Sequence, residues 1–532
     1  MRRVGHFALI VFEIAFLTLL ILATRCANYQ DVFVGGNVYF VDADCYARMT
    51  RAEMVRARPG SIIRHHSFEN FPQGTKPHTT APLDYLIVAL SAIIVAARPA
   101  VGPCQLDLAG AFVSPLLALV GGWFLWWWSR RMKFRYGWAM LTLYAISPML
   151  VHGTELGRPD HQSLIILLVT VAICAEWSSQ ILQPTNSASA WWLTSATSWA
   201  MAIWVSAYEP FILFFVVTAT ALLVNRRTVL GRDRRAGWIL FPAIIAIAFA
   251  VERRVPSFAI LESTEHLKHW GSTIGELAHV SPVNPVWLNW CGYLLLITPI
   301  LVWMNIRTRT GGAHGVHALP IYALLVATYF LTIWQARWGY FFVLIFALAL
   351  PVFLAPIKSG AAVAIAFVLS MFPIFRDWEE RLWPNEAQLA RRMEKQIESV
   401  EIRDLAVRLR SPEVHPFLAP WWLSPSISYW SGQPGVAGSS HESLEGIDQS
   451  ASFFLSGNLQ EERGILARCH VAWVFGYDSE RVAQNSAAIL KRPVPLQPLC
   501  GVLDRTPSQA PPFLIFFAQN PTCKLYRVNV ER

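Results

Sequence analysis

The 532-residue chain has little charge: Asp, Glu, Lys and Arg make up 15% of it, whereas hydrophobic residues make up 54%. A soluble protein of this size would carry about a quarter charged residues. The shortage of charge therefore excludes an ordinary soluble protein and predicts a polytopic α-helical membrane protein. The 23 Trp residues fit the aromatic belts found where helices cross a membrane surface.

Several common catalytic and binding patterns are absent. The sequence has no Gly-rich phosphate loop, no nucleophile elbow of a serine hydrolase and no HExxH motif. Its eight cysteines form no CxxC pair and no zinc-ligand spacing. Cys469, Cys500 and Cys523 lie in the polar C-terminal part, where one disulfide could form outside the cytoplasm, although sequence cannot give the pairing.

Eleven apolar runs approach the length of about 20 residues that a spanning helix needs. They are 7–25, 108–128, 136–152, 162–179, 190–207, 210–225, 237–252, 286–305, 317–334, 339–356 and 360–376. We interpret the first run as an uncleaved span, because it is too long for a typical signal peptide and has no clear cleavage site.

The basic loops predict the orientation of these spans. Arg and Lys concentrate at 129–135, 225–235 and 307–309, which should be cytoplasmic. All three fall on that side only if the apolar segment 82–98 does not span, so we place it on or in the outer leaflet, within a large external loop 26–107. The net charge of +9 thus reflects topology and attraction to anionic lipids, not nucleic-acid binding.

Composition divides the chain near residue 376. Residues 1–376 form the predicted transmembrane domain, with a second external loop at 253–285. After 376 the chain becomes charged and mixed, with a helical stretch to about 410 and short β-like stretches. Residues 377–532 are long enough to bury a core, so we predict a soluble α/β domain outside the cytoplasm.

An acidic cluster occupies the first external loop. Asp42 and Asp44 are followed closely by Arg48. One interpretation is a helix cap, with Asp42 preceding a helix over 44–58. The other is a ligand set for a cation, and Asp42 could serve both purposes.

A second polar cluster opens the span predicted at 162–179. It contains Arg158, Asp160, His161 and Gln162. Asp160 can simply cap this helix, with His161 at an interface. Alternatively, these carboxylate, imidazole and amide groups hold a divalent metal beside a helix N-terminus that favours phosphate.

Two later residues are further candidates. Glu276 follows Gly275 in the loop 253–285, and a glycine beside an acid suits a loop that closes over a site. Arg337 lies at the junction of two apolar runs. It either extends to the lipid headgroups or binds the phosphate of a lipid-linked substrate with its planar guanidinium.

Together these clusters resemble the motifs of GT-C membrane glycosyltransferases, above all the catalytic subunit of oligosaccharyltransferase and its single-subunit bacterial and archaeal relatives. In that family an Asp is followed six residues later by Arg, as in Asp42 and Arg48. Residues 157–162 resemble the acidic motif that follows the third span in the family. Thr-Ile-Gly-Glu at 273–276 resembles the family's TIxE-like motif.

Two more motifs follow in the same order. Arg337, in Ala-Arg-Trp-Gly-Tyr, resembles the family's arginine at the outer end of a helix late in the chain, which binds the donor phosphate. A WWDYG motif opens the external domain, where this chain has Trp421, Trp422 and Leu423. The resemblance covers most of the chain, and the order of the motifs is stronger evidence than any one of them.

The resemblance implies divalent-metal-dependent transfer of a glycan from a polyprenyl-(pyro)phosphate donor to an acceptor on the outer face of the membrane, with Mg²⁺ or Mn²⁺ as cofactor. The residues it implies are Asp42 and Glu276 for catalysis; Asp42, Asp160, Gln162 and His161 for the metal; Arg337 for the donor phosphate; and Asp44, Arg48, Arg158, Trp421 and Trp422 as additional candidates.

Two departures affect the expected substrate. Gln162 stands where the family has Asp, His or Glu, which bears on the identity of the metal. Leu423 replaces the Asp that helps bind the acceptor hydroxyl, so the acceptor is either a protein or, in the main alternative, a lipid or polysaccharide. The expected location is a bacterial inner membrane with the active site and C-terminal domain periplasmic or extracellular. A transporter or an inactive scaffold is the non-enzymatic alternative.

Overall fold

The computed structural model describes residues 2–78, 81–97, 104–181, 186–253, 265–307 and 319–529. The chain divides into two compact units. Unit 1 comprises Met1–Tyr29, Phe112–Val255 and Glu276–Asn385, and unit 2 comprises Gln30–Ala111, Pro256–Gly275 and Glu386–Arg532. Residues 254–264 of the predicted loop 253–285 lie outside the described residues.

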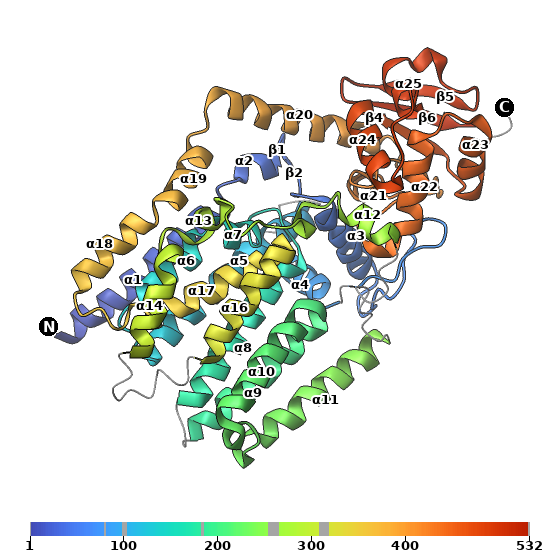
Figure 1. The fold of residues 1–532 in the computed structure, drawn as a ribbon. Coiled ribbons are helices and arrows are strands. Elements are labelled where there is room, and N and C mark those ends of the chain that lie inside the picture. Colours follow the sequence, from blue (N-terminus) through green and yellow to red (C-terminus); the bar gives the residue numbers. More distant parts are fainter. Residues whose placement is uncertain are drawn as a thin grey trace. The chain divides into compact units, whose positions relative to one another are not determined.

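Each apolar run predicted from the sequence is helical in unit 1 (Figure 1). The helices are α1 (Arg2–Arg25), α5 (Gln105–Arg131, which begins in unit 2), α6 (Gly137–Ile146), α7 (Pro148–His152), α8 (His161–Ile181), α9 (Asn186–Val205), α10 (Tyr208–Val229), α11 (Arg235–Glu252), α13 (Val286–Cys291), α14 (Leu294–Arg307), α16 (Leu319–Trp334), α17 (Gly339–Leu354), α18 (Gly360–Ser370) and α19 (Phe372–Leu382), with short turns η2 (Arg232–Arg234), η4 (Gly275–Leu277) and η5 (Ala336–Trp338).

Three of the predicted runs are broken helices rather than straight ones. Pro148 starts α7 directly after α6 because a proline suits the first turn of a helix but not its interior. Gly292 separates α13 from α14 with φ of 73°, where a Cβ would lie 2.5 Å from the carbonyl oxygen of Ser370. Helices α18 and α19 meet at an angle of 48°.

By length and composition, five helices of the described part could cross a membrane, or six if the bent pair α18–α19 is one span. Another five apolar helices are shorter, among them α4 (Ala81–Ala97). These helices fit the predicted helical membrane protein. The number of eleven spans stays a prediction.

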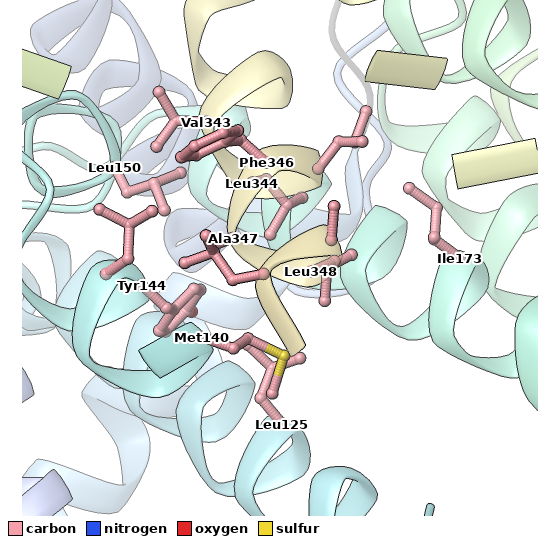
Figure 2. Close-up of a cluster of buried hydrophobic side chains, with 14 of the residues drawn as sticks. Leu125, Met140, Tyr144, Leu150, Ile173, Val343, Leu344, Phe346, Ala347 and Leu348 are labelled. Carbon is pink, nitrogen blue, oxygen red and sulfur yellow. The ribbon is translucent and has the colours of Figure 1, made fainter. Parts of the chain in front are cut away.

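Helix α17 forms the centre of unit 1. All 16 of its residues are buried, as expected of a helix that is apolar around its whole circumference. Val343, Leu344, Phe346, Ala347 and Leu348 pack in one cluster with side chains of neighbouring helices (Figure 2). The helices α6, α14 and α16 all pack against it. The residues directly before α17 are therefore held by a rigid support.

Unit 2 combines a small helical part with a four-stranded sheet of order β3-β4-β6-β5. Strand β3 (Phe417–Leu418) runs parallel to β4 (Trp473–Tyr477), and β6 (Cys523–Val528) runs antiparallel to both β4 and β5 (Leu514–Gln519). The other elements are α2 (Tyr29–Val32), β1 (Phe33–Val34), β2 (Asn37–Val38), α3 (Ala43–Ala57), α4, α12 (Glu265–Gly271), α20 (Glu386–Val407), α21 (Ser424–Ser431), η6 (His441–Ser443), α22 (Leu444–Leu455), α23 (Leu459–Arg468), α24 (Ser479–Leu490), α25 (Leu499–Arg505) and η7 (Pro507–Gln509).

Two features of unit 2 bear on the sequence analysis. Residues 30–111 cluster with 386–532, whereas composition grouped them with the membrane domain. The disulfide considered in the C-terminal part does not form, because Cys469, Cys500 and Cys523 are all buried free thiols.

Candidate active site

A tight loop before α8 carries the first group of polar residues in unit 1. Leu156 is fastened to the end of α1, since its backbone N–H donates to the carbonyl of Arg25 at 2.8 Å. Gly157 has φ of 76°, a left-handed conformation that favours glycine. The chain then turns sharply, with the N–H of Asp160 donating to the carbonyl of Arg158 at 2.7 Å. This geometry delivers Asp160 to the N-terminus of α8.

Asp160 lies directly before His161, the first residue of α8. Its Oδ1 accepts a hydrogen bond from the backbone N–H of His161 at 2.6 Å and lies 2.5 Å from Nδ1 of the same residue. The Asp160 side chain is only about one-tenth exposed. These contacts do not rule out a role in ligand binding, because a carboxylate offers about four acceptor positions.

Glu276 lies beside the same loop. Its Oε1 is 3.8 Å from Nη1 of Arg158 and accepts a hydrogen bond from the Tyr340 hydroxyl at 3.2 Å. The ring of His152 lies between Tyr340 and Arg158. Its Nδ1 is 2.8 Å from the Tyr340 hydroxyl, and its Nε2 is 3.0 Å from Nη2 of Arg158. The Glu276 side chain remains 37% exposed, so a substrate can reach it.

Arg337 lies in η5, directly before the buried helix α17. Its Nη2 is 2.5 Å from Oε1 of Glu209, which is completely buried at the start of α10. Gln162 donates from Nε2 to the same Glu209 oxygen at 3.5 Å. Glu276 and Asp160 are also close enough to attract the positive charge of Arg337. The carboxylates of Glu209, Glu276 and Asp160 thus all act on the guanidinium of Arg337, and Arg158 adds a second guanidinium beside Glu276.

Some polar atoms of this cluster have no hydrogen-bond partner among the described residues. They include Oε2 of Glu209, Oε1 of Gln162 and Nε of Arg337, all of them buried. A buried polar atom without a partner is costly, and each such atom in a native protein needs an explanation. Two oxygens and one guanidinium N–H are what a hard divalent cation and a phosphate oxygen would satisfy. The residues therefore fit the metal that the motifs imply.

Unit 1 brings together five of the residues predicted from sequence: Arg158, Asp160, Gln162, Glu276 and Arg337. His161 belongs to the same group through its contact with Asp160. The other predicted residues lie in unit 2, where their own surroundings are described next. Their part in a shared site with these residues stays a prediction.

Asp42 caps helix α3, and its side chain accepts from the N–H of Cys45 at 3.0 Å. Asp44 lies in the first turn of that helix. Arg48 is buried and donates to Asp84 at 2.8 Å. The six-residue spacing from Asp42 to Arg48 therefore places the arginine on the same helix with an acidic partner from α4.

Trp421 and Trp422 precede α21 at right angles to each other, their ring centroids 5.9 Å apart. Trp421 donates from Nε1 to Asn485 at 2.9 Å and packs edge-on against Trp270. Trp422 has the guanidinium of Arg481 5.3 Å from its ring. Leu423, where the resembling family has Asp, is buried.

Sequence reasoning missed Glu209, Tyr340 and His152 as site residues. Glu209 stood beside Pro210 at the start of an apolar run, and a carboxylate at such a position was the available signal. Tyr340 was visible only as part of the Arg337 motif. The pairing of Glu209 with Arg337 joins α10 to η5 and follows from tertiary packing.

No family model matches the chain, and no curated protein matches its sequence. Solved structures do resemble its fold. The Archaeoglobus fulgidus oligosaccharyltransferase AglB, in complex with an inhibitory peptide and a dolichol-phosphate, has a TM-score of 0.66 at 14% identity over 90% of this chain and 70% of its own.

Two further structures are similar. The same Archaeoglobus fulgidus enzyme in complex with Zn and sulfate has a TM-score of 0.63 at 13% identity, over 97% of this chain and 73% of its own. ArnT from Cupriavidus metallidurans bound to undecaprenyl phosphate has a TM-score of 0.56 at 15% identity, over 98% of both chains. This chain therefore has the fold of GT-C glycosyltransferases, as the order of its motifs predicted.

Proposed function

We propose that this protein is a membrane glycosyltransferase that moves a sugar or glycan from a polyprenyl-phosphate-linked donor to an acceptor. The observation that carries the proposal is the gathering of Asp160, Glu209 and Glu276 around Arg337 in a chain with the GT-C fold. Carboxylates are costly to hold together unless a cation is present.

In this proposal Arg337 binds the donor phosphate. The leaving group departs as an anion, and a preorganised guanidinium stabilises the charge that develops on it. Glu209 fixes one edge of Arg337, while Nε has no partner among the described residues and can donate to a phosphate oxygen. The AglB and ArnT structures contain dolichol-phosphate and undecaprenyl phosphate, which supports a lipid phosphate as donor.

The proposed metal ligands are Asp160 and Gln162, with Asp42 as predicted from the motif and His161 as a further candidate. Glu209 is added to this set because its Oε2 is buried beside Gln162 without a partner among the described residues. Oxygen ligands favour Mg²⁺ or Mn²⁺. When bound, the ion would act as a Lewis acid that neutralises charge on the phosphate.

Glu276 is proposed to hold the acceptor, together with Asp42. Arg158 and Tyr340 both contact Glu276 and keep its carboxylate in one orientation. A carboxylate in this position can accept a proton from the attacking group as the bond to the sugar forms. Its partial exposure leaves it open to an incoming acceptor.

The acceptor is either a protein, as in oligosaccharyltransferases, or a lipid or polysaccharide. Leu423 favours the second possibility, because it stands where the family uses an Asp to bind a hydroxyl group and its side chain is buried. A hydrophobic side chain cannot replace that hydrogen bond. Incubation with a sequon peptide and, separately, with a membrane lipid extract would identify the acceptor by mass spectrometry.

We place the reaction at the outer face of a bacterial inner membrane. The support comes from the basic loops 129–135, 225–235 and 307–309, which the positive-inside rule assigns to the cytoplasm. The two loops that carry Asp160 and Glu276 then face outward. Labelling of single cysteines introduced at Glu155 and Arg307 from the two sides of the membrane tests this orientation.

The proposed activity is tested with purified protein and a synthetic polyprenyl-phosphate sugar. We expect Asp42→Ala and Glu276→Ala to abolish donor turnover while the proteins remain folded. Glu265→Ala, which removes an exposed carboxylate of the same loop as Glu276, is the control and should retain activity. Chelation should stop turnover, and Mn²⁺ or Mg²⁺ should restore it.

Full activity of both variants would overturn the assignment. Turnover that resists chelation would overturn the metal requirement and leave a metal-free GT-C mechanism. A transporter or an inactive scaffold would show no transfer under any of these conditions.

A further inference from the structure

Two segments of unit 2 that are far apart in sequence lie side by side. Residues 66–75 run along residues 428–446, joined by backbone hydrogen bonds from Phe71 N–H to Gly435 O at 3.1 Å and from Gly435 N–H to Phe68 O at 3.0 Å. Asn70 adds a third link, since its Oδ1 accepts from the N–H of Gly446 at 2.8 Å. These contacts fix the two segments before any ligand binds.

Two histidines and a glutamate meet beside these segments. His78 follows the first segment, and His441 and Glu442 belong to the second. Nδ1 of His78 is 2.8 Å and Nε2 of His441 is 3.7 Å from Oε1 of Glu442. The three potential ligand atoms all lie within 4.8 Å of one another. The two imidazole rings are 4.7 Å apart between centroids.

The surroundings of Glu442 favour an added positive charge. The buried Arg51 interacts electrostatically with Arg48, Asp84, Glu69 and Glu442. Oε2 of Glu442 is buried and has no hydrogen-bond partner among the described residues. A bound cation would satisfy this oxygen.

We propose that His78, His441 and Glu442 bind a Zn²⁺ ion. Two imidazoles and one carboxylate suit zinc, whereas Mg²⁺ avoids nitrogen ligands. The three ligands leave a fourth position for water or a further ligand. This site shares no residue with the proposed ligands of Mg²⁺ or Mn²⁺. Its effect is structural and therefore goes beyond the proposed transferase activity. The ion would link the segment at His78 to the loop before α22.

Zinc retention tests the proposal without donor or acceptor. The full-length protein is purified, stripped with a chelator, loaded with ZnCl₂ in the presence of excess MgCl₂ and freed of unbound metal, and its zinc content is measured by mass spectrometry. His441→Gln should retain about one zinc fewer per chain than the wild type. His415→Gln is the matched control, because His415 lies 3.5 Å from Glu413 and belongs to no group of three potential metal ligands among the described residues.

A second measurement keeps the test valid if one variant fails to fold. Co²⁺ bound in place of zinc by nitrogen and oxygen ligands gives visible absorption bands, which should be present in the wild type and His415→Gln and lost in His441→Gln and His78→Gln. Equal zinc content and equal Co²⁺ spectra in all four proteins would overturn the site. Since no transfer is assayed, this outcome is independent of whether the proposed transferase activity is found.

Discussion

The two ends of helix α8 each lie beside a pair of Arg and Glu, and the two pairs differ in how completely they are hydrogen-bonded. Near the C-terminal end, Arg234 donates from both Nη atoms to Glu176, at 2.8 and 3.0 Å. Ser195 donates to the same carboxylate at 3.0 Å. The rings of Trp192 and Trp238 lie 4.0 and 4.9 Å from the guanidinium carbon.

Near the N-terminal end, Arg337 and Glu209 share one close contact and leave Nε and Oε2 without partners among the described residues. Gln162, which contacts this pair, precedes Glu176 by 14 positions on α8. At 1.5 Å per residue, the two pairs are about 21 Å apart along the helix.

This difference supports our proposal that the first pair is structural and the second functional. A buried ion pair is stable only when hydrogen bonds satisfy its remaining atoms, and the Arg234–Glu176 pair meets this condition. In the Arg337–Glu209 pair, Nε and Oε2 have no partner among the described residues, so a phosphate and a metal ion can bind to them.

The largest expected effect concerns the structural pair. Glu176→Gln leaves the buried charge of Arg234 uncompensated and should lower the free energy of unfolding by about 3–5 kcal/mol. Unfolding of the purified protein by heat or denaturant measures the loss. Asp377→Asn is the control, because it breaks the i,i+4 contact with Arg381 on a partly exposed helix surface and should cost about 0.3–0.5 kcal/mol. Similar losses in both variants would contradict the contrast.

The same substitution at both ends gives the second test. Arg337→Lys removes the planar fork from the proposed phosphate site and should reduce donor turnover by roughly 100-fold with little change in melting temperature. Arg234→Lys loses a two-point contact and two aromatic neighbours, so it should lower the melting temperature instead. Undiminished turnover in Arg337→Lys would remove this residue from the donor site.

The third test uses the pH dependence of folding stability at another buried carboxylate, Glu69 in unit 2. Burial raises the pKa of Glu69 to about 7 from its ordinary 4.5. The folded protein then holds this proton more tightly than the unfolded chain. Its contribution to stability is complete below pH 4.5, falls by up to about 1.4 kcal/mol per pH unit as the pH rises to 7, and changes no further above that.

Melting temperatures at pH 5, 6 and 7 measure this effect. The wild type should lose stability over this range relative to Glu69→Gln, which cannot titrate. Parallel curves for the two proteins would show that Glu69 is ionised throughout and that the neighbouring Arg51 fully compensates its burial.

The smallest expected effect concerns the metal requirement. Glu209→Gln keeps the shape of the side chain but weakens an oxygen ligand, so the Mn²⁺ concentration for half-maximal turnover should rise by about 10-fold. Glu155→Gln is the matched control, since Glu155 lies 3.6 Å from Arg158 in the neighbouring loop. An unchanged Mn²⁺ requirement in Glu209→Gln would assign Glu209 solely to holding Arg337.

Much of the fold followed from the sequence because long apolar runs and the spacing of short motifs are local properties. The GT-C fold and the helical character of every predicted run were anticipated in this way. The breaks at Pro148 and Gly292 had visible signals, yet hydropathy alone merged the helices on either side. The length of an apolar run does not show where a helix bends.

The candidate site was only partly predictable. Asp160, Gln162, Glu276 and Arg337 were found because each belonged to a recognisable motif. Glu209 was missed because its importance comes from a contact with Arg337 that only packing creates. The Glu176–Arg234 pair was missed for the same reason, since 58 residues separate its members.

The complete burial of α17 has a consequence for how the protein tolerates its lipid surroundings. A helix with no outward-facing side cannot tilt to match a thinner or thicker bilayer, whereas α1 and α11, which are mostly exposed, can adjust. The depth of Arg337, at the start of α17, is then set by its protein neighbours. The reactive phosphate of a long-chain lipid would meet its binding group at a fixed height in membranes of different composition.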